Sequence, residues 1–388
     1  MLTPQGWLVA LVSVALVAAG RLFGIYELYL LGAGAAALVI AAAISVARTR
    51  MRIDIARSIH PPRVHAGGPS RVELEVSNRG KRRSPLLTLR DPVGDGRSAS
   101  VVVAPLQPGE SVRATYRLPT DRRGILHVGP LAVQVSDPFG LASTSTRAAP
   151  VVELTVWPTI DDVSPLPHTI GDDPHGGADH PNALTAAGDD FYALRAYVVG
   201  DDLRHVHWRS TARRDELMVR QDEMPWQGRA TILLDTRFEA HTPQTFEWAV
   251  SAAASVVVAC SRRNFLVRLL TTGGHDTGVG AGQAHIEQLL ERLATVELDK
   301  QGTLPAAAGA LRRAASGAGA VALLLGGASL DADAVARMRR GFTHCTAIAF
   351  CDGGSTATGR GLHVVDEEHP FGLVWRHAVS RRPMGARR

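Results

Sequence analysis

The chain has 388 residues, of which 45% are hydrophobic, 20% charged and 5% aromatic, so it is too long for one small module and too apolar for a disordered protein. Its formal net charge is +5, but the positive charge is dispersed and aromatic residues are few, which argues against a nucleic-acid-binding surface. The three cysteines, Cys260, Cys345 and Cys351, lack a paired spacing. This excludes a disulfide scaffold and a zinc ribbon as organising principles.

Residues 1–50 are predicted to form a transmembrane hairpin. The runs 1–20 and 28–47 carry no charge, and each has the length of a helix that crosses a hydrocarbon core of about 30 Å. A cleaved signal peptide is the alternative, but no basic residue precedes the first run. The hairpin turn carries only Arg21, whereas four arginines follow the second run: Arg48, Arg50, Arg52 and Arg57. The positive-inside rule therefore predicts a multi-pass protein of the cell membrane whose large C-terminal part is cytoplasmic.

Residues 51–158 are predicted to form an antiparallel β-sandwich, with an immunoglobulin-like arrangement. The segment 71–77 alternates apolar and polar residues and is followed by Asn78, Arg79 and Gly80, which is typical of a strand and a turn. Further short strands are expected at 86–89, 100–103, 111–118, 124–128, 131–136 and 151–157. Proline and glycine separate these segments, as in a sandwich. No catalytic grouping stands out, so this unit is interpreted as a spacer or interaction module.

Residues 159–188 are rich in proline, glycine, aspartate and histidine, a composition typical of a linker or an extended loop. The next segment, 189–228, interleaves arginines, acidic pairs and large apolar residues. Guanidinium groups beside carboxylates and an indole favour a buried, hydrogen-bonded network that clamps the segment to the next domain. A helix is expected to begin after Gly200 and Asp201, with Asp202 as its cap.

A catalytic interpretation of the same segment is possible in chemical terms. Asp201 or His207 would act as a general base, and Arg204 or Arg213 would bind an anionic substrate. The segment has no nucleophile or metal motif at a defined spacing. We therefore favour the clamp or a partner-binding surface over a catalytic site.

The segment 189–228 resembles the signature of the bacterial domain-of-unknown-function family 58. The residues that carry the resemblance, and that we take as candidate binding residues, are Arg195, Tyr197, Gly200, Asp201, Asp202, Arg204, His207, Trp208, Ala212, Arg213 and Arg220. The run 137–141, Asp-Pro-Phe-Gly-Leu, also resembles the part of the family that leads to this signature. Such proteins often have a transmembrane hairpin, a β-rich segment and a von Willebrand factor A-like domain. The resemblance implies a MoxR-type AAA+ ATPase as partner and supplies no reaction.

Residues 229–380 are predicted to form a doubly wound α/β domain, in agreement with the von Willebrand factor A-like fold that the resemblance implies. Apolar strands alternate with helix-length segments, and ligands gather at the carboxyl ends of such strands. The strands are expected at 229–235, 265–271, 320–325 and 345–350, and the helices at 244–262, 284–293 and 331–340. Residues 381–388 form a basic tail.

A magnesium site of the Asp-x-Ser-x-Ser type is common in von Willebrand factor A-like folds. Asp235 occupies the first position here, but Arg237 and Glu239 stand where the serines would be. An arginine at a ligand position places a cation beside the metal ion, which is unfavourable. We therefore expect no cofactor and expect Asp235 to cap its loop or to pair with Arg237, with Mg²⁺ binding as the alternative.

Three functional hypotheses follow. The first is a membrane-anchored, cytoplasm-facing adaptor, not an enzyme, that works with a MoxR-type AAA+ ATPase in the assembly or maturation of partner proteins. The second is a hydrolase-like enzyme that uses Asp201, His207 and Arg213. The third is a divalent-cation-dependent binding module at Asp235. The absence of a catalytic motif and the modular layout favour the first.

Overall fold

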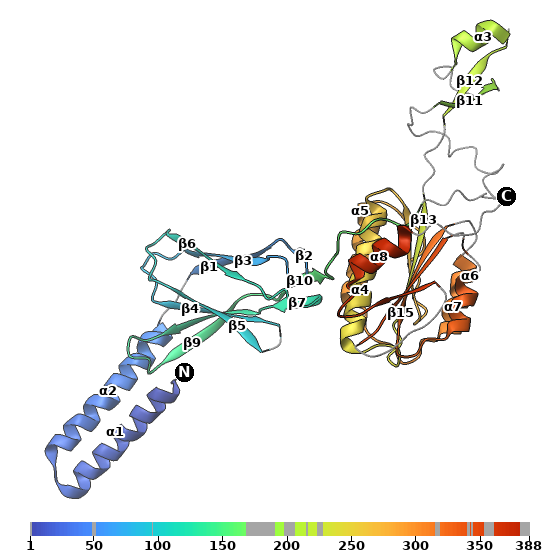
Figure 1. Cartoon of the computed structure of the whole chain (residues 1–388). Coiled ribbons are helices and arrows are strands. Elements are labelled where there is room, and N and C mark those ends of the chain that lie inside the picture. Colours follow the sequence, from blue (N-terminus) through green and yellow to red (C-terminus); the bar gives the residue numbers. More distant parts are fainter. Residues whose placement is uncertain are drawn as a thin grey trace. The chain divides into compact units, whose positions relative to one another are not determined.

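The computed structural model of the chain forms two compact units, Met1–Thr159 and Ile160–Arg388. The residues that it describes are 2–48, 52–94, 96–167, 191–197, 206–214, 216–222, 228–314, 319–339, 342, 344–352 and 361–380. Figure 1 shows the elements in chain order. Each unit is considered by itself.

The first unit begins with an antiparallel helical hairpin, α1 (Pro4–Phe23) and α2 (Tyr26–Arg48). Both helices are long and apolar enough to cross a membrane, by length and composition. They pack through small residues, since the Ser13 hydroxyl donates a hydrogen bond to the Gly32 carbonyl at 2.8 Å. Close packing of this kind is typical of helices in a bilayer, where apolar side chains face lipid. The prediction of two apolar N-terminal helices is confirmed.

Two sheets follow the hairpin, and their strands pair antiparallel except for β2, which pairs with β10 in parallel. The first sheet has the order β1-β3-β6, and the second has the order β2-β10-β7-β4-β8-β9, with β5 paired to β4. The strands are β1 (Ile53–His60), β2 (Arg63–His65), β3 (Arg71–Asn78), β4 (Leu87–Val93), β5 (Arg97–Val103), β6 (Ser111–Arg117), β7 (Gly124–Val128), β8 (Leu131–Ser136), β9 (Ser143–Ala149) and β10 (Val152–Trp157).

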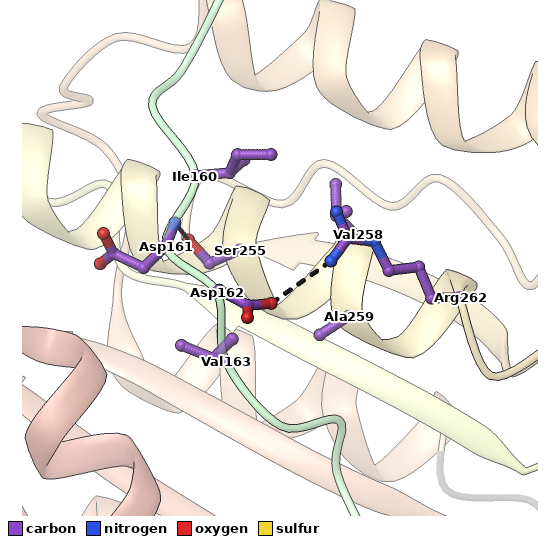
Figure 2. Close-up of a pocket in the computed structure, with 8 residues that line it drawn as sticks. All are labelled: Ile160, Asp161, Asp162, Val163, Ser255, Val258, Ala259 and Arg262. Atoms are coloured by element: carbon purple, nitrogen blue, oxygen red, sulfur yellow. Dashed lines mark hydrogen bonds and ion pairs between the residues drawn. The ribbon is translucent and has the colours of Figure 1, made fainter.

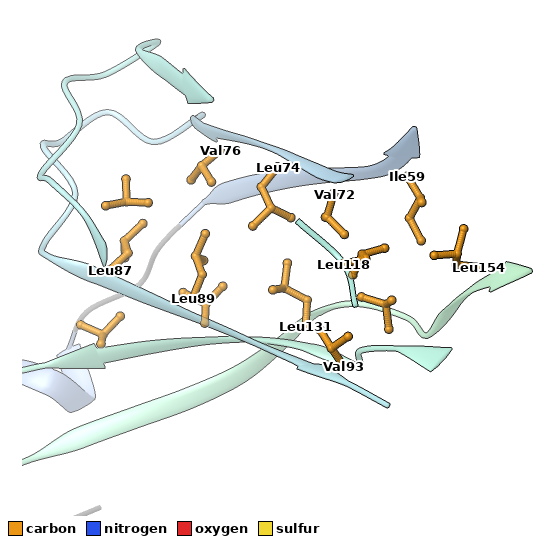
Figure 3. Close-up of a cluster of buried hydrophobic side chains, with 14 of the residues drawn as sticks. Ile59, Val72, Leu74, Val76, Leu87, Leu89, Val93, Leu118, Leu131 and Leu154 are labelled. Atoms are coloured by element: carbon orange, nitrogen blue, oxygen red, sulfur yellow. The ribbon is translucent and has the colours of Figure 1, made fainter. Parts of the chain in front are cut away.

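The core of the β-rich region lies between the two sheets (Figure 3). Alternate residues of β3 face inward, and Val72, Leu74 and Val76 are almost completely buried against Leu87 and Leu89 of β4. This alternation is the pattern from which the strand was predicted. The predicted β-rich region is confirmed, and β1, β2 and β9 are additional to the predicted strands.

A buried ion pair joins the two sheets of the β-rich region. Arg57 of β1 donates from Nη1 to Oδ1 of Asp91 in β4 at 2.6 Å, and both side chains are at most 2% exposed. The hydroxyl of Tyr116 in β6 donates to Oδ2 of Asp91, also at 2.6 Å. Burial and the Asp91 carboxylate raise the pKa of Tyr116 far above its usual range, so it stays a donor. Arg57 was counted above as a juxtamembrane charge, but the structure places it in this core.

The Arg57–Asp91 pair yields a prediction about stability. Asp91→Ala leaves a buried guanidinium without its carboxylate, which costs about 3–5 kcal/mol. Glu73→Ala is the matched control, because Glu73 pairs with Arg71 on the exposed face of β3, and such pairs contribute less than about 1 kcal/mol. Hydrogen exchange of the β3 core amides measures both losses. Equal losses in the two variants would contradict the prediction.

The second unit contains a parallel sheet with the order β14-β13-β15-β16-β17. Helices α4, α5 and α8 cover one face, and α6 and α7 cover the other (Figure 1). The strands are β13 (Arg229–Leu234), β14 (Leu266–Thr271), β15 (Ala320–Gly326), β16 (His344–Phe350) and β17 (Leu362–Val365). The helices are α4 (Pro243–Ser261), α5 (Gln283–Thr295), α6 (Leu304–Ala314), α7 (Ala332–Arg339) and α8 (Phe371–Ser380).

This arrangement confirms the predicted α/β region, with strands alternating with helices. Every residue of β15 is buried, as expected for a central strand of a parallel sheet covered on both faces. α4 begins at Pro243 because Thr242 caps its first turn. Helices α6 and α8 and the short strand β17 are additional to the predicted elements.

The first residues of the predicted linker are packed against the α/β domain. The backbone amide of Asp161 donates to Ser255 Oγ in α4 at 2.8 Å, and Trp375 Nε1 in α8 donates to the Ser164 carbonyl at 2.7 Å. Leu166 is 1% exposed. Ile160, Val163 and Leu166 are partly or fully buried, which makes this stretch part of the second unit, although its composition predicted a free linker. The rest of the predicted linker and the basic tail 381–388 lie outside the described residues.

Candidate functional site

The candidate site lies where strand order reverses in the parallel sheet, at the carboxyl ends of β13 and β15. In sheets of this topology the loops that follow the two strands diverge and leave a place for ligands. Asp235 directly follows β13, and Gly326 ends β15. The backbone amide of Asp235 donates to the Leu324 carbonyl at 2.8 Å, which fixes the loop after β13 at this edge.

The Asp235 carboxylate is completely buried and accepts five hydrogen bonds. Arg237 donates to it from Nε at 3.0 Å and from Nη2 at 2.8 Å, one bond to each oxygen. The backbone amides of Arg237 and Gly326 and the hydroxyl of Thr272 donate the remaining three, at 3.1–3.2 Å. This bidentate geometry is the strong form of an ion pair. The prediction that Asp235 pairs with Arg237 is confirmed.

The guanidinium of Arg237 is held on its other side by the loop after β15. It donates from Nη2 to the Ser329 carbonyl at 2.9 Å and lies 3.4 Å from Ser329 Oγ through Nη1. Its side chain is 6% exposed. The guanidinium therefore occupies the space beside the carboxylate that a metal ion would need.

These residues do not fit a magnesium ion. The Asp235 carboxylate already neutralises a cation that the chain itself supplies, and a divalent ion would meet that cation. In the part of the chain that the structure describes, no group of three or more histidine, cysteine or acidic residues is placed to hold a metal. We derive no metal-dependent step at this site.

The loop after Arg237 presents an exposed surface, here called the edge surface, made of Phe238, Glu239 and Lys300. Phe238 is 58% exposed, and Lys300 Nζ lies 5.6 Å from the centre of its ring, within cation–π range. The backbone amide of Phe238 donates to the Asp299 carbonyl at 2.9 Å, which holds Lys300 beside the ring. The buried pair therefore fixes the shape of an exposed apolar and charged patch.

The edge surface was not singled out from the sequence. An aromatic residue among polar neighbours directly after a strand was the available signal at Phe238. Lys300 is one of only two lysines in the chain, but it comes from a distant loop.

His241, which precedes α4, is buried close to the ion pair. Its Nδ1 lies 3.3 Å from Thr245 Oγ1. Burial lowers the pKa of His241, and the neighbouring guanidinium of Arg237 acts in the same direction against the opposing Asp235 carboxylate. The imidazole is thus neutral at physiological pH and adds no second cation beside Arg237.

The signature segment forms a small hairpin, β11 (Phe191–Ala196) and β12 (Met218–Asp222), with α3 (Trp208–Arg214) between the strands. Arg195 pairs with Val219 across the hairpin, and Arg220 pairs with Leu194. Tyr197 is half-buried, and its amide donates to the Leu217 carbonyl at 2.7 Å. Four predicted site residues lie outside the described residues: Gly200, Asp201, Asp202 and Arg204.

The described part of the signature does not form the buried clamp that was predicted for it. Trp208 is 68% exposed, and Ala212 and Arg213 are also exposed. His207 lies 2.9 Å from Ser210 Oγ through Nδ1, a contact within the first turn of α3. The helix begins at Trp208, six residues beyond the predicted cap Asp202.

A hollow lies beside α4, where residues 160–163 run along the helix (Figure 2). Its volume is about 340 Å³. Asp162 faces Arg262 at 3.4 Å in an exposed ion pair, and Asp161 is tied to Ser255 through its backbone. These contacts seat the start of the second unit on α4, and the hydroxyl of Ser255, the buried polar side chain that lines the hollow, is already bonded to the Asp161 amide and the Ser251 carbonyl.

Along the chain, two apolar helices are followed by a β-rich region and then by a parallel α/β domain, whose carboxyl edge is closed by an arginine. The model of the family described as "Protein of unknown function DUF58" matches residues 193–354. This part of the chain is therefore similar to DUF58 proteins, which confirms the resemblance drawn from the signature.

No curated protein matches the sequence. Among solved structures, the CARDB domain of the PF1109 protein from Pyrococcus furiosus, crystallised in complex with di-metal ions, is similar at 16% identity over 27% of this chain and 91% of that chain, with a TM-score of 0.20. β-Glucosidase 3B from Thermotoga neapolitana is similar at 14% identity over 27% of this chain and 17% of that chain, with a TM-score of 0.16. Similarities of this extent carry no argument about function.

The closed carboxyl edge predicts how the α/β domain responds to Mg²⁺ and to loss of the guanidinium. A bound ion would raise the Tm with its concentration. Because Arg237 occupies the place of the ion, millimolar Mg²⁺ is expected to leave the Tm unchanged. Arg237→Ala lowers stability by about 3–5 kcal/mol, since it leaves a buried carboxylate unpaired.

The control for the Arg237 variant is Arg337→Ala, because Arg337 pairs with Asp331 at half-exposed positions. That pair contributes less than about 1 kcal/mol. Differential scanning calorimetry measures the unchanged protein, these two variants and Asp235→Ala with and without the ion. A Tm that rises with Mg²⁺ in the unchanged protein and not in Asp235→Ala would contradict the claim that the site at Asp235 binds no metal ion.

Proposed function

We propose that this protein is a membrane-anchored adaptor that faces the cytoplasm and docks on a MoxR-type AAA+ ATPase through the carboxyl edge of its α/β domain. The observation that carries the proposal is the Asp235–Arg237 pair. It closes the place where an enzyme of this topology would bind its substrate, and it presents the edge surface instead. The ATPase partner follows from the family resemblance.

The anchor and its orientation rest on length and charge. α1 and α2 each match the thickness of a hydrocarbon core. Arg48 at the end of α2 and Arg52 just beyond it are exposed, whereas the other end of the hairpin carries Arg21 alone, in the last turn of α1. The positive-inside rule then places both domains in the cytoplasm, the compartment in which a soluble ATPase can reach them. The protein is accordingly a multi-pass protein of the cell membrane.

The finer fold assignments belong to the same proposal. The α/β domain is a von Willebrand factor A-like domain that has exchanged its metal for Arg237. In support, an antiparallel segment extends the sheet beyond β14, through bridges of Leu270 with Asp276 and of Val267 with Gly280. The β-rich region is immunoglobulin-like, in support of which its two mainly antiparallel sheets enclose one core.

The edge surface has the chemistry of a protein contact. Aromatic residues at the centre of an interface contribute most of its affinity, and charges at the rim contribute specificity. Phe238 supplies the aromatic group, and Glu239 and Lys300 flank it with opposite charges. The Arg237 anchor keeps the loop in one conformation, so little conformational entropy is lost when a partner binds.

The docking proposal is tested by binding of the full-length, detergent-extracted protein to the purified MoxR-type ATPase, after crosslinking and mass spectrometry have identified that ATPase. Phe238→Ala weakens binding at least about tenfold, the loss expected for an interfacial aromatic anchor. Val279→Ala is the matched control, since Val279 is 52% exposed in another loop of the same domain. Unchanged affinity in Phe238→Ala, or equal loss in both variants, would contradict docking at the edge surface.

A further inference from the structure

The turn between β8 and β9, residues 137–142, is held in one conformation by a buried aspartate. Asp137 is 6% exposed, and its two carboxylate oxygens accept hydrogen bonds from the amides of Phe139 at 2.9 Å and of Ala142 at 2.6 Å. Gly140 has a φ of +69° and donates its amide to the Asp137 carbonyl at 3.0 Å, which completes a tight turn. The sequence motif Asp-Pro-Phe-Gly-Leu thus encodes a rigid element.

This turn is bonded to the first residues of α1. Thr3, the cap of α1, donates its amide to the Leu141 carbonyl at 2.9 Å and its hydroxyl to the Gly140 carbonyl at 2.6 Å. Gly6 approaches Leu141 so closely that a β-carbon there would meet the Leu141 carbonyl oxygen. Leu141 and Ala142 also pack into one apolar cluster with Val39, Ala42 and Val46 of α2.

The length of α1 fixes the depth of the turn in a membrane. α1 has 20 residues, and at about 1.5 Å per residue it spans about 30 Å, the whole thickness of a hydrocarbon core. Its first residue must therefore lie at the boundary between hydrocarbon and headgroups. Because Thr3 is bonded to the turn, the turn lies at that boundary too, on the side where α2 ends in Arg48.

Phe139, at the tip of this turn, is 64% exposed. Phe139 is not part of the apolar cluster in which Leu141, two residues later, is buried. We infer that residues 137–142 form a membrane-surface contact in which Phe139 enters the headgroup region of the leaflet that also holds Thr3 and Arg48. The partner is the lipid surface itself, continuous with the lipid-facing sides of the two helices. Aromatic side chains favour this interfacial layer, and arginine binds its phosphates.

The contact sets the height and orientation of the β-rich region above the bilayer. A flexible tether would let that region tumble, whereas a turn bonded to α1 and immersed at its tip holds it in one pose. The inference rests on the proposed membrane anchoring of α1 and α2. It does not depend on the identity of the ATPase.

A fluorescence quenching experiment on the full chain in phospholipid vesicles tests the contact. Phe139→Cys and Val102→Cys variants are labelled with a thiol-reactive NBD dye at neutral pH. The two sites are matched, at 64% and 63% exposed, and Val102 lies on β5, which β4 separates from the strand that leads into the turn. The native thiols react slowly, because burial raises the pKa of Cys260 to about 11 and of Cys345 to about 12, and Cys351 is buried.

The expected result is a loss of NBD fluorescence at position 139, and not at 102, when the vesicles carry lipids with a nitroxide in the headgroup or near the top of the acyl chain. A nitroxide near the chain end quenches neither label. Absence of quenching at 139 in protein that resists carbonate extraction overturns the lipid contact alone. A blue shift at 139 without quenching overturns it in favour of a protein occupant. Release of the protein by carbonate overturns the contact together with the membrane anchor.

Discussion

The Asp235–Arg237 ion pair is the interaction on which the architecture of the α/β domain depends. A carboxylate at the end of a central strand is far from water, and burying it is costly unless a cation and hydrogen bonds neutralise it. Arg237 provides both from two residues away, and it also bonds Ser329 in the loop after β15. One guanidinium thus joins the loops of two neighbouring strands. The carboxyl edge becomes a rigid, closed surface that presents Phe238 to solvent.

The first unit uses buried aspartates in a comparable way. Asp91 joins its two sheets by accepting from Arg57 and Tyr116, and Asp137 shapes the turn that is bonded to α1. Asp91 accepts from two separate strands, and the turn that Asp137 shapes is bonded to α1, so loss of either carboxylate would release more than one element. The apolar helices and the β-rich region consequently form one body, and the proposed anchor carries that body at a defined height.

The sequence predicted what depends on local pattern. The alternation in 71–77 and the apolar run 320–325 became β3 and β15, and the close spacing of Asp235 and Arg237, with one residue between them, made their pairing foreseeable. What depends on distant residues was not foreseeable. β1 was missed because its Arg57 reads as a surface charge until Asp91, 34 residues later, pairs with it. The predicted burial of Trp208 was wrong. An indole is usually buried, but whether it is depends on the segments that pack against its helix, and the residue type does not specify them.

The central claim is that a metal-free carboxyl edge is the docking surface for the ATPase. Hydrogen–deuterium exchange of the full-length protein, with and without the purified MoxR-type ATPase and in the presence of a metal chelator, tests it most directly. The account predicts slower exchange of the amides in residues 236–240 and 299–301 when the ATPase is added. Unchanged exchange there, with protection only in the signature hairpin or only after Mg²⁺ is restored, would contradict it.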